Sequence, residues 1–336
     1  MRDVVLEACD VGHRVVVRRR VGTGGHGRPL YTDLLGDLVA IDDQRLTLRA
    51  DDGTEHSVEL TEVAAGKRIP PRPVRYSEMA ALERIADDAW PAPEHERLGD
   101  WFLRSAAGFT NRANSALPLG DPGCRLDEAI DACAEWYLAR SLPPKITVPL
   151  PLRRDVAAAL IRRGWHAQPP VLVQTALLAD VLAVPRSITG PVPGHESKPP
   201  APIRLQRTPS TGFLRIITAR KAGLPEAAHR VLHGVGEVRF AEVPESTGDA
   251  AMPRAIARGA MVGEWMHLGL VEVVESARRL GLARAVSQAL ASWASSAGAV
   301  QALLQVEEHN TAAVGLYASM GFHTHHTYVT YRAPDI

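Results

Sequence analysis

The residues best suited to chemistry lie in one turn near the C-terminal end of the chain. Four of the five residues 270–274 are apolar and three of these are β-branched, which predicts a strand. The segment Arg278-Arg279-Leu280-Gly281-Leu282-Ala283 follows, and apolar residues at helical spacing as far as Trp293 then predict a long helix. A strand, a tight turn and a helix N-terminus in this order can bind an anion. The first N–H groups of the helix have no intrahelical partner, and the helix dipole favours negative charge there.

The residue types of this turn suit a phosphate. Gly281 has no Cβ and allows a close approach to the backbone, and Ala283 is small enough to do the same. Arg278 and Arg279 add positive charge beside it. The pattern Arg-x-x-Gly-x-Ala also describes an ordinary arginine-rich helix start, so the residues that follow must separate the two interpretations.

A second strand and helix follow this turn. Residues 301–306 form another apolar strand, and Asn310 stands where a helix N-cap belongs. The predicted helix continues through Tyr317, Gly321 ends it, and Phe322 can pack back onto it.

Taken together, these residues resemble the GNAT superfamily of N-acetyltransferases over roughly the last third of the chain. The resemblance rests on Arg278-x-x-Gly281-x-Ala283, Leu303-Leu304-Gln305-Val306, Asn310-x-x-Ala313-x-x-Leu316-Tyr317 and Gly321-Phe322. One position departs from the family, which often has proline three residues before the arginine, where this chain has Glu275.

The resemblance implies acetyl-coenzyme A (acetyl-CoA) as co-substrate. It implies that the pyrophosphate lies on the backbone of residues 279–284 and that pantetheine pairs with the preceding strand. It also implies that Asn310 contacts the pantetheine arm and that Tyr317 lies near the thioester sulfur. The expected binding residues are Val271, Val273, Arg278, Arg279, Leu280, Gly281, Leu282, Ala283, Arg284, Asn310, Ala313 and Tyr317.

Acetyl transfer needs an acid for the leaving thiolate and a base for the amine. Tyr317 is the expected acid, although a packed tyrosine on a helix would look the same in the sequence. Glu272 is the expected base, on the strand face opposite Val271 and Val273. The alternatives that stay open are a water chain or one of Glu242, Glu264 and His267.

Length and composition restrict the remaining possibilities. A chain of 336 residues should hold two or three domains, and an apolar fraction of 46% suffices for ordinary cores. Lys plus Arg and Asp plus Glu are equal at 38 each, so the whole chain gives no electrostatic indication of nucleic acid or membrane binding. The three cysteines match no metal or disulfide pattern. Without an apolar leader or a membrane-spanning stretch, the expected location is the cytoplasm.

A histidine group near the C-terminus invites a metal interpretation. On a regular strand His323 and His325 would share one face and His326 would point away, with no carboxylate or cysteine nearby in the sequence. The sequence therefore favours ordinary strand residues and no metal.

The N-terminal part predicts a small SH3-like β-barrel over residues 1–66, followed by a stiff proline-rich linker. Its basic run, Arg14 with Arg18-Arg19-Arg20, reads as a solvated strand face more readily than as a nucleic-acid patch, because no alternating aromatic residues support base stacking. This barrel is a candidate docking module for a protein partner.

The rest of the chain predicts two related α/β halves with mixed sheets, a tandem-GNAT layout. Residues 75–184 form a degenerate GNAT-like domain, because Gly120-Asp121-Pro122-Gly123 puts an acid and a proline where a phosphate turn needs arginine and N–H groups. Residues 109–115 are predicted as a strand whose polar part, 110–114, is either a solvated edge or a wall for the acceptor. A proline-rich linker, 185–200 within the segment 185–209, leads to the catalytic domain at 201–336.

Two functions remain open from the sequence. The favoured one is an acetyl-CoA-dependent N-acetyltransferase acting on a primary amine of a small molecule or a protein lysine. The alternative is an acyl-CoA-binding regulatory or adaptor module without turnover. The acceptor and the oligomeric state cannot be deduced from the sequence.

Overall fold

A computed structural model describes residues 6–70, 72–185, 202–221, 224–245 and 252–334. The chain divides into two compact units, Met1–Pro73 and Val74–Ile336. Most of the predicted linker at 185–200 lies outside the described residues.

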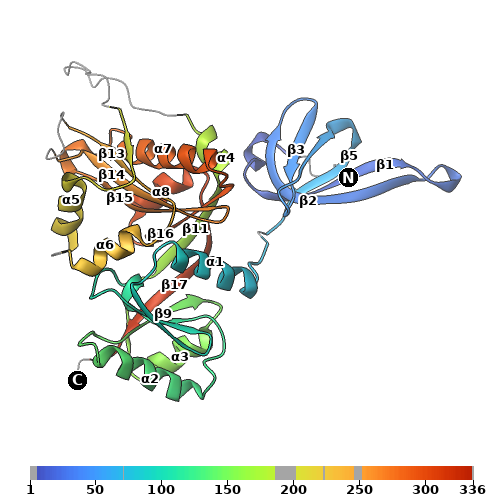
Figure 1. The fold of residues 1–336 in the computed structure, drawn as a ribbon. Coiled ribbons are helices and arrows are strands. Elements are labelled where there is room, and N and C mark those ends of the chain that lie inside the picture. The colour runs from blue at the N-terminus through green and yellow to red at the C-terminus, as the bar shows by residue number, and fades with distance from the viewer. Residues whose placement is uncertain (1–5, 71, 186–201, 222–223, 246–251, 335–336) are drawn as a thin grey trace. The chain divides into compact units, whose positions relative to one another are not determined.

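The N-terminal unit is a five-stranded antiparallel sheet in the order β4-β3-β2-β1-β5 (Figure 1). Its strands are β1 (Arg14–Thr23), β2 (Pro29–Ile41), β3 (Arg45–Arg49), β4 (Glu55–Glu59) and β5 (Val63–Arg68). Alternating inward residues such as Val15, Val17 and Leu38 build its core. This sheet is compatible with the predicted barrel, and its SH3-like topology stays a prediction.

The β1–β2 hairpin of this unit extends beyond its core as a two-stranded arm (Figure 1). Of the glycine-rich segment 22–29, only residues 24–28 lie outside the two strands. Strand β1 continues to Thr23, β2 begins at Pro29, and a single 3-10 turn, Gly25–Gly27, joins them.

The second unit is organised around a nine-stranded mixed sheet, with path order β10-β17-β11-β16-β15-β14-β13-β12 and β9 paired to β17. Strands β15 and β16 are parallel neighbours. The strands are β9 (Lys145–Leu150), β10 (His166–Ala167), β11 (Val171–Leu177), β12 (Arg204–Gln206), β13 (Val238–Val243), β14 (Ala255–Val262), β15 (Trp265–Val273), β16 (Gln301–Glu307) and β17 (His323–Arg332).

Helices cover both faces of this sheet. On one face α4 (Leu178–Ala183), α7 (Leu282–Ser296) and α8 (Thr311–Ala318) bury apolar side chains in one core cluster with β14, β15 and β16. On the other face α5 (Thr211–Lys221) and α6 (Glu226–His233) pack over β13 and β14, while α1 (Tyr76–Asp88) covers β11, β16 and β17.

The first half of this unit has its own core. This half contains a three-stranded sheet, and its helices α2 and α3 pack against β9. These elements are β6 (Glu94–Leu98), β7 (Trp101–Ser105), β8 (Leu117–Pro118), α2 (Leu126–Leu138) and α3 (Arg154–Arg162).

Strand β17 joins the two halves, which we call the first and second lobes. Its beginning pairs with β11, and its end pairs with β9 and β10 of the first lobe. Strand β11, the last strand of the predicted first half at 75–184, lies between β16 and β17. The sheet is therefore continuous across both lobes.

The strand predicted at 109–115 is wrong. This segment is a loop that ends in a 3-10 turn, Arg112–Asn114, with Thr110 in the left-handed region at φ 60°. The buried Asn114 side chain accepts the N–H groups of Ala106 and Gly108 and donates to the carbonyls of Phe109 and Thr110. A local side chain therefore supplies the hydrogen bonds that a neighbouring strand would otherwise provide.

Candidate functional site

The parallel strands β15 and β16 separate partway along their length. They pair from Trp265–Gln301 to Leu268–Leu304, and residues 269–273 have no partner on β16. The separation begins at a bulge, because Arg258 pairs with Gly269 whereas Ile256 pairs with Glu272. Leu270 lies within the bulge at φ 53°, an uncommon conformation for an apolar residue.

The bulge leaves one edge of β15 available for pairing. The Val274 N–H donates to the Arg254 carbonyl at 3.0 Å, on the β14 side. Because backbone groups alternate along a strand, Val271 and Val273 direct their N–H and C=O groups toward the separated side. An extended ligand could hydrogen-bond to this edge as another strand would.

The turn before α7 has the backbone of an anion-binding nest. Arg279 and Gly281 both lie in the left-handed region, at φ 66° and 75°. The first hydrogen bond into the helix runs from the Ala285 N–H to the Gly281 carbonyl at 3.0 Å. The amides of Leu282 and Ala283 thus precede the first intrahelical donor and are available to an anion.

Two arginines near this turn carry their charge in solvent. Arg278 and Arg279 are exposed and have no ion-pair partner within the described residues. Arg284 instead donates to the Ser319 hydroxyl at 2.7 Å, which ties α7 to the end of α8. The turn therefore combines open amides with positive charge, as the sequence predicted.

Helix α8 presents the two other predicted residues. The Asn310 Oδ1 accepts the Ala313 N–H at 3.2 Å, which confirms the predicted N-cap. Tyr317 is buried at 7% exposure and meets the Phe322 ring edge-on, with centroids 5.8 Å apart. Burial raises the pKa of Tyr317 to about 12. Its hydroxyl is protonated at neutral pH and can donate a proton or a hydrogen bond.

The carboxylates considered as bases occupy different places. Glu242 and Glu272 both pair with Ile256, from opposite sides, and so lie on the same sheet face. Two strand spacings separate their backbones by about 10 Å. Glu242 is 4% exposed and accepts the Ser210 N–H at 3.0 Å. Glu264 is exposed in the β14–β15 hairpin turn, away from the separated strands.

His267 is buried on β15 just before the separation. Its Nε2 lies 3.4 Å from the Gln305 Oε1, and its Nδ1 has no hydrogen-bond partner among the described residues. Burial, together with the nearby charges of Arg112 and Arg258, lowers the pKa of His267 to about 3. The imidazole is therefore neutral at physiological pH, and it is too weak a base to hold the proton of an amine by itself.

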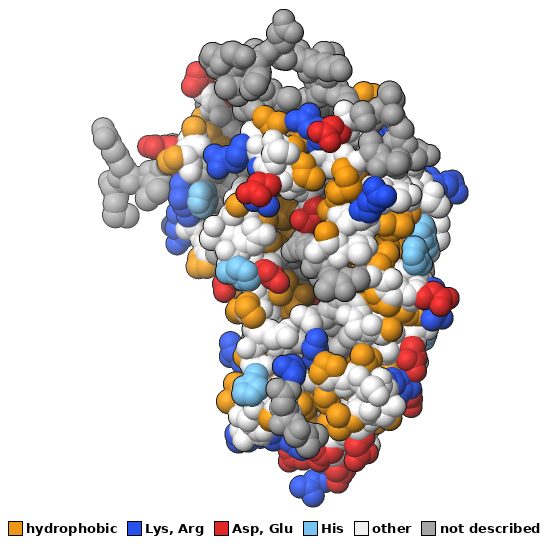
Figure 2. Space-filling model, turned by 90° about the vertical axis from the view of Figure 1, so that its left-hand side faces the viewer, with side chains coloured by type: hydrophobic (Ala, Val, Ile, Leu, Met, Phe, Trp, Pro, Cys, Tyr) orange, Lys and Arg blue, Asp and Glu red, His pale blue; other side chains and the backbone are white. Residues whose placement is uncertain are grey.

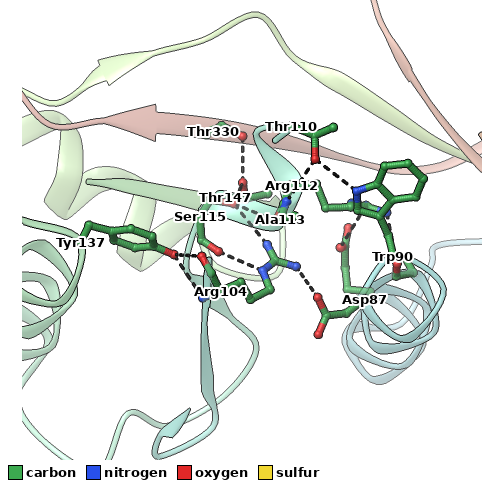
Figure 3. Close-up of polar contacts among 12 residues, drawn as sticks. Asp87, Trp90, Arg104, Thr110, Arg112, Ala113, Ser115, Tyr137, Thr147 and Thr330 are labelled. Carbon is green, nitrogen blue, oxygen red and sulfur yellow. Dashed lines mark hydrogen bonds and ion pairs between the residues drawn. The ribbon is translucent and has the colours of Figure 1, made fainter. Parts of the chain in front are cut away.

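The first lobe supplies a wall beside this histidine, and Figure 3 shows the part of the wall that contains Trp90 and Thr110. The Trp90 indole N–H donates to the Thr110 hydroxyl at 3.1 Å, and the Trp90 ring lies 6.2 Å from the His267 ring. Arg112 lies over the Tyr328 ring at 5.8 Å. Residues 110–114 are thus folded against the sheet rather than forming a solvated edge strand, and their contact with an acceptor stays a prediction.

A buried polar network holds this wall in place (Figure 3). Arg104, 2% exposed, donates to Asp87 of α1 at 2.6 Å and to the Ser115 carbonyl at 2.9 Å. Hydroxyl contacts of 2.8 Å continue from Ser115 to Thr147 and from Thr147 to Thr330 of β17. Because the network is satisfied within the protein, it fixes the loop relative to the sheet.

The histidines at the start of β17 depart from the predicted alternation. A register shift against β11 falls at His325, which turns its Nδ1 to 2.8 Å from the His326 Nδ1. The buried His326 bonds Glu83 of α1 at 2.8 Å. Burial pushes the pKa of Glu83 up, but the hydrogen bond and charge of His326 and the charge of Arg112 leave it below its usual value.

Neither a metal cluster nor a membrane-spanning helix was found in the part of the chain that the structure describes. Among the described residues, no three His, Cys, Asp or Glu side chains gather in a way that could hold a metal ion. Figure 2 shows one face of the molecule, with a hollow near its middle where hydrophobic and acidic side chains lie together.

These features define a class of enzyme. A mixed sheet whose parallel strands separate at a bulge, followed by an open-amide turn and a long helix, is the architecture of GNAT N-acetyltransferases. The fold matches that of a GCN5-related N-acetyltransferase from Kribbella flavida, with a TM-score of 0.53 and 15% identity over 77% of this chain and 96% of that one.

The particular family follows from the sequence comparisons. The chain belongs to the family described as "Probable histone acetyltransferase Rv0428c C-terminal", which matches residues 76–331. It is 32% identical over 324 residues to "Probable histone acetyltransferase Rv0428c" of Mycobacterium tuberculosis, covering 94% of this chain and 93% of the relative. It is also 23% identical over 246 residues to "Uncharacterized N-acetyltransferase YobR" of Bacillus subtilis, covering 72% of this chain and 93% of that protein. The protein is an acetyltransferase, which favours the catalytic function over the adaptor.

Proposed function

We propose that this enzyme transfers an acetyl group from acetyl-CoA to a primary amine. The observation that carries the proposal is the continuity of two open backbone surfaces, the separated edge of β15 and the turn before α7. A ligand with an extended amide arm and a pyrophosphate fits both surfaces at once.

Each part of the co-substrate has residues suited to hold it. The pyrophosphate suits the amides of residues 279–284, with Arg278 and Arg279 as mobile counter-charges. The pantetheine arm suits the backbone of Val271 and Val273 and the start of α8 at Asn310. When bound, this group supplies an activated acetyl thioester.

The side chains of the site then handle protons. The Tyr317 hydroxyl, protonated at neutral pH, gives a proton to the departing sulfur. Glu272 takes the proton of the acceptor nitrogen, directly or through water, from the sheet face that it shares with Glu242. Neutral His267 serves this face as a hydrogen-bonding group rather than as the base.

The acceptor is a primary amine of a small molecule or a protein lysine. The name of the M. tuberculosis relative refers to histones, and a lysine acceptor for this chain is a proposal on that ground. The first-lobe wall of Trp90 and residues 110–114 forms the other side of the acceptor site.

The test is calorimetric titration with acetyl-CoA of the wild type, Gly281→Asp and the matched control Gly281→Asn. Both side chains are tolerated at the positive φ of this position, so their difference isolates the charge. Gly281→Asp should weaken binding roughly 100-fold, about 2.7 kcal/mol, and Gly281→Asn by roughly tenfold or less. Equal binding by all three proteins would place the phosphate elsewhere. No binding by the wild type would remove the acetyl-CoA proposal.

The acceptor is tested separately by following thiol release. The wild type is given acetyl-CoA with small primary amines or with lysine peptides. Turnover with one group identifies the acceptor class. Tight co-substrate binding with no turnover on either would return the proposal to the adaptor alternative.

A further inference from the structure

The arm formed by β1 and β2 concentrates positive charge on a chain that is neutral overall. Residues 18–33 contain four arginines and one aspartate, a net charge of +3 with His26 neutral. The aspartate, Asp33, is bound to Arg18 in a two-bond pair of 2.8 and 2.9 Å. Arg19, Arg20 and Arg28 have no carboxylate partner among the described residues.

The same arm exposes large apolar side chains. Val21, Leu30 and Tyr31 are 52%, 51% and 50% exposed, and Tyr31 pairs directly with Arg20 across the ribbon. Exposed apolar and aromatic groups interleaved with arginines mark an interaction surface. The exposed Arg18 and Arg20 fit the solvated strand face expected from the sequence, and β1 and β2 continue this face as far as Thr23 and Pro29.

We propose that the β1–β2 arm binds duplex DNA, with Arg19, Arg20 and Arg28 on the phosphates. The major groove of B-DNA is about 12 Å wide and admits a two-stranded β-ribbon. From Arg18 to Thr23 the ribbon is about 20 Å long, enough to enter the groove. The turn is rich in glycine, including Gly24 and Gly25, so its backbone can approach the sugar–phosphate chain closely.

The chemistry favours DNA over other polyanions. Phosphate contacts account for the arginines, and the groove accounts for the ribbon and its exposed Tyr31. An A-form RNA duplex has a deep and narrow major groove that would exclude this ribbon. The inference is independent of acetyl transfer, since the arm lies in the other compact unit of the chain.

The test measures fluorescence anisotropy of a labelled 20-base-pair duplex of mixed sequence with the full-length protein, at several salt concentrations. The arm variant Arg19→Gln/Arg20→Gln is compared with the control Arg45→Gln/Arg49→Gln, whose arginines pair with Glu59 and Glu55 on the same sheet. The arm variant should bind at least tenfold more weakly, and its log K against log salt slope should fall by about 2. The control should keep both values.

A third variant and three other ligands complete the test. Arg19→Lys/Arg20→Lys retains the charge and should retain most of the binding, which separates charge loss from misfolding. Absence of wild-type binding at 50 mM salt, or equal losses in the arm and control variants, would overturn the proposal. Equal affinity for double-stranded RNA, or for heparin or an acidic peptide, would overturn it in favour of a general polyanion surface.

Discussion

Both lobes of the larger unit contain a strand, a turn and a helix in the same order. Only the turn of the second lobe, before α7, has open amides. Before α2 the Asp121 carboxylate accepts the Gly123 N–H at 2.8 Å, and Asp100 accepts the Asp121 N–H at 3.2 Å. Residues 278–281, directly before α7, contain no acid, and two left-handed residues, Arg279 and Gly281, shape an open turn. In the first lobe, carboxylates therefore bind amides within the turn itself, whereas the turn of the second lobe has no such internal acceptor.

The strand ahead of each turn differs in the same way. In the first lobe the Gly120 carbonyl is occupied by the indole N–H of Trp101 at 3.1 Å and by the guanidinium of Arg153. In the second lobe the corresponding edge beyond Leu268 has no partner strand. Side chains of the first lobe thus occupy a carbonyl ahead of its turn, whereas residues 269–273 of the second lobe have no partner on β16.

Helices α3 and α8 correspond residue by residue at their C-terminal ends. Gly164 and Gly321 both end a helix at positive φ, and the next N–H, from Trp165 or Phe322, returns to a carbonyl five residues earlier at 3.0 Å. That carbonyl belongs to Leu160 in the first lobe and to Tyr317 in the second. The helix ending is thus the same in both lobes, whereas only the second lobe has a tyrosine hydroxyl there.

The largest expected effect comes from removing the hydroxyl that distinguishes the second lobe, for example by replacing Tyr317 with the leucine found at the corresponding position of the first lobe. Tyr317→Leu and the more conservative Tyr317→Phe both remove the proposed acid. Turnover should fall roughly 100-fold, the usual effect of losing a general acid. Affinity for acetyl-CoA should stay within a few-fold in Tyr317→Phe, because the ring and its contact with Phe322 are kept. Steady-state rates and calorimetry measure the two effects separately.

The opposite outcome would remove Tyr317 from the proposed proton transfer. If Tyr317→Phe retains full turnover, the hydroxyl is not the acid, and Tyr317 is a packing residue. Tyr137→Phe in the first lobe is the matched control. It should leave turnover unchanged, because the Tyr137 hydroxyl donates to the Arg104 carbonyl inside the first lobe.

The sequence predicted the local elements better than the connections between them. The turn at Gly281, the N-cap at Asn310 and the amphipathic helices depend on neighbouring residues, and the structure has each where it was predicted. The loop at 109–115 was missed because the side chain of Asn114 replaces a partner strand. No local signal could have revealed this.

Long-range pairing explains the other omissions. Strand β17 serves both lobes because β9 and β11 pair at different stretches along it, which depends on residues far apart in the chain. The bulge at His325 follows from that register and re-aims a side chain that strict alternation placed on the other face. Of the base candidates, the sequence could not show that Glu242 and Glu272 share a face, or that His267 is buried against Trp90.

A second prediction concerns the contact between the lobes at His267. Its pKa is about 3 in the folded protein and about 6.5 when unfolded, so the unfolded chain binds more protons between these values. Stability should therefore fall as the pH decreases below 6.5. From pH 7 to 5 this group should contribute a loss of roughly 2 kcal/mol. His267→Gln should remove that part of the pH dependence.

Urea unfolding followed by tryptophan fluorescence measures this effect, because all six tryptophans lie in the unit Val74–Ile336. The exposed His309 provides the control substitution His309→Gln, which should leave the pH dependence as in the wild type. The prediction fails if the free energy of unfolding of His267→Gln falls between pH 7 and pH 5 as much as that of the wild type. His267 would then titrate normally, and the lobes would not exclude water from it.

The smallest expected effect tests the closed turn of the first lobe. Asp121→Ala removes the acceptor for the Gly123 N–H and should lower the free energy of unfolding by about 1 kcal/mol. Asp121→Asn keeps an acceptor oxygen and should cost less. Neither change should alter acetyl-CoA affinity, because the proposed ligand site is the turn at Gly281 and not this turn. A loss of acetyl-CoA affinity in Asp121→Ala, with stability retained, would mean that the first lobe takes part in binding and that the two turns are not divided in function.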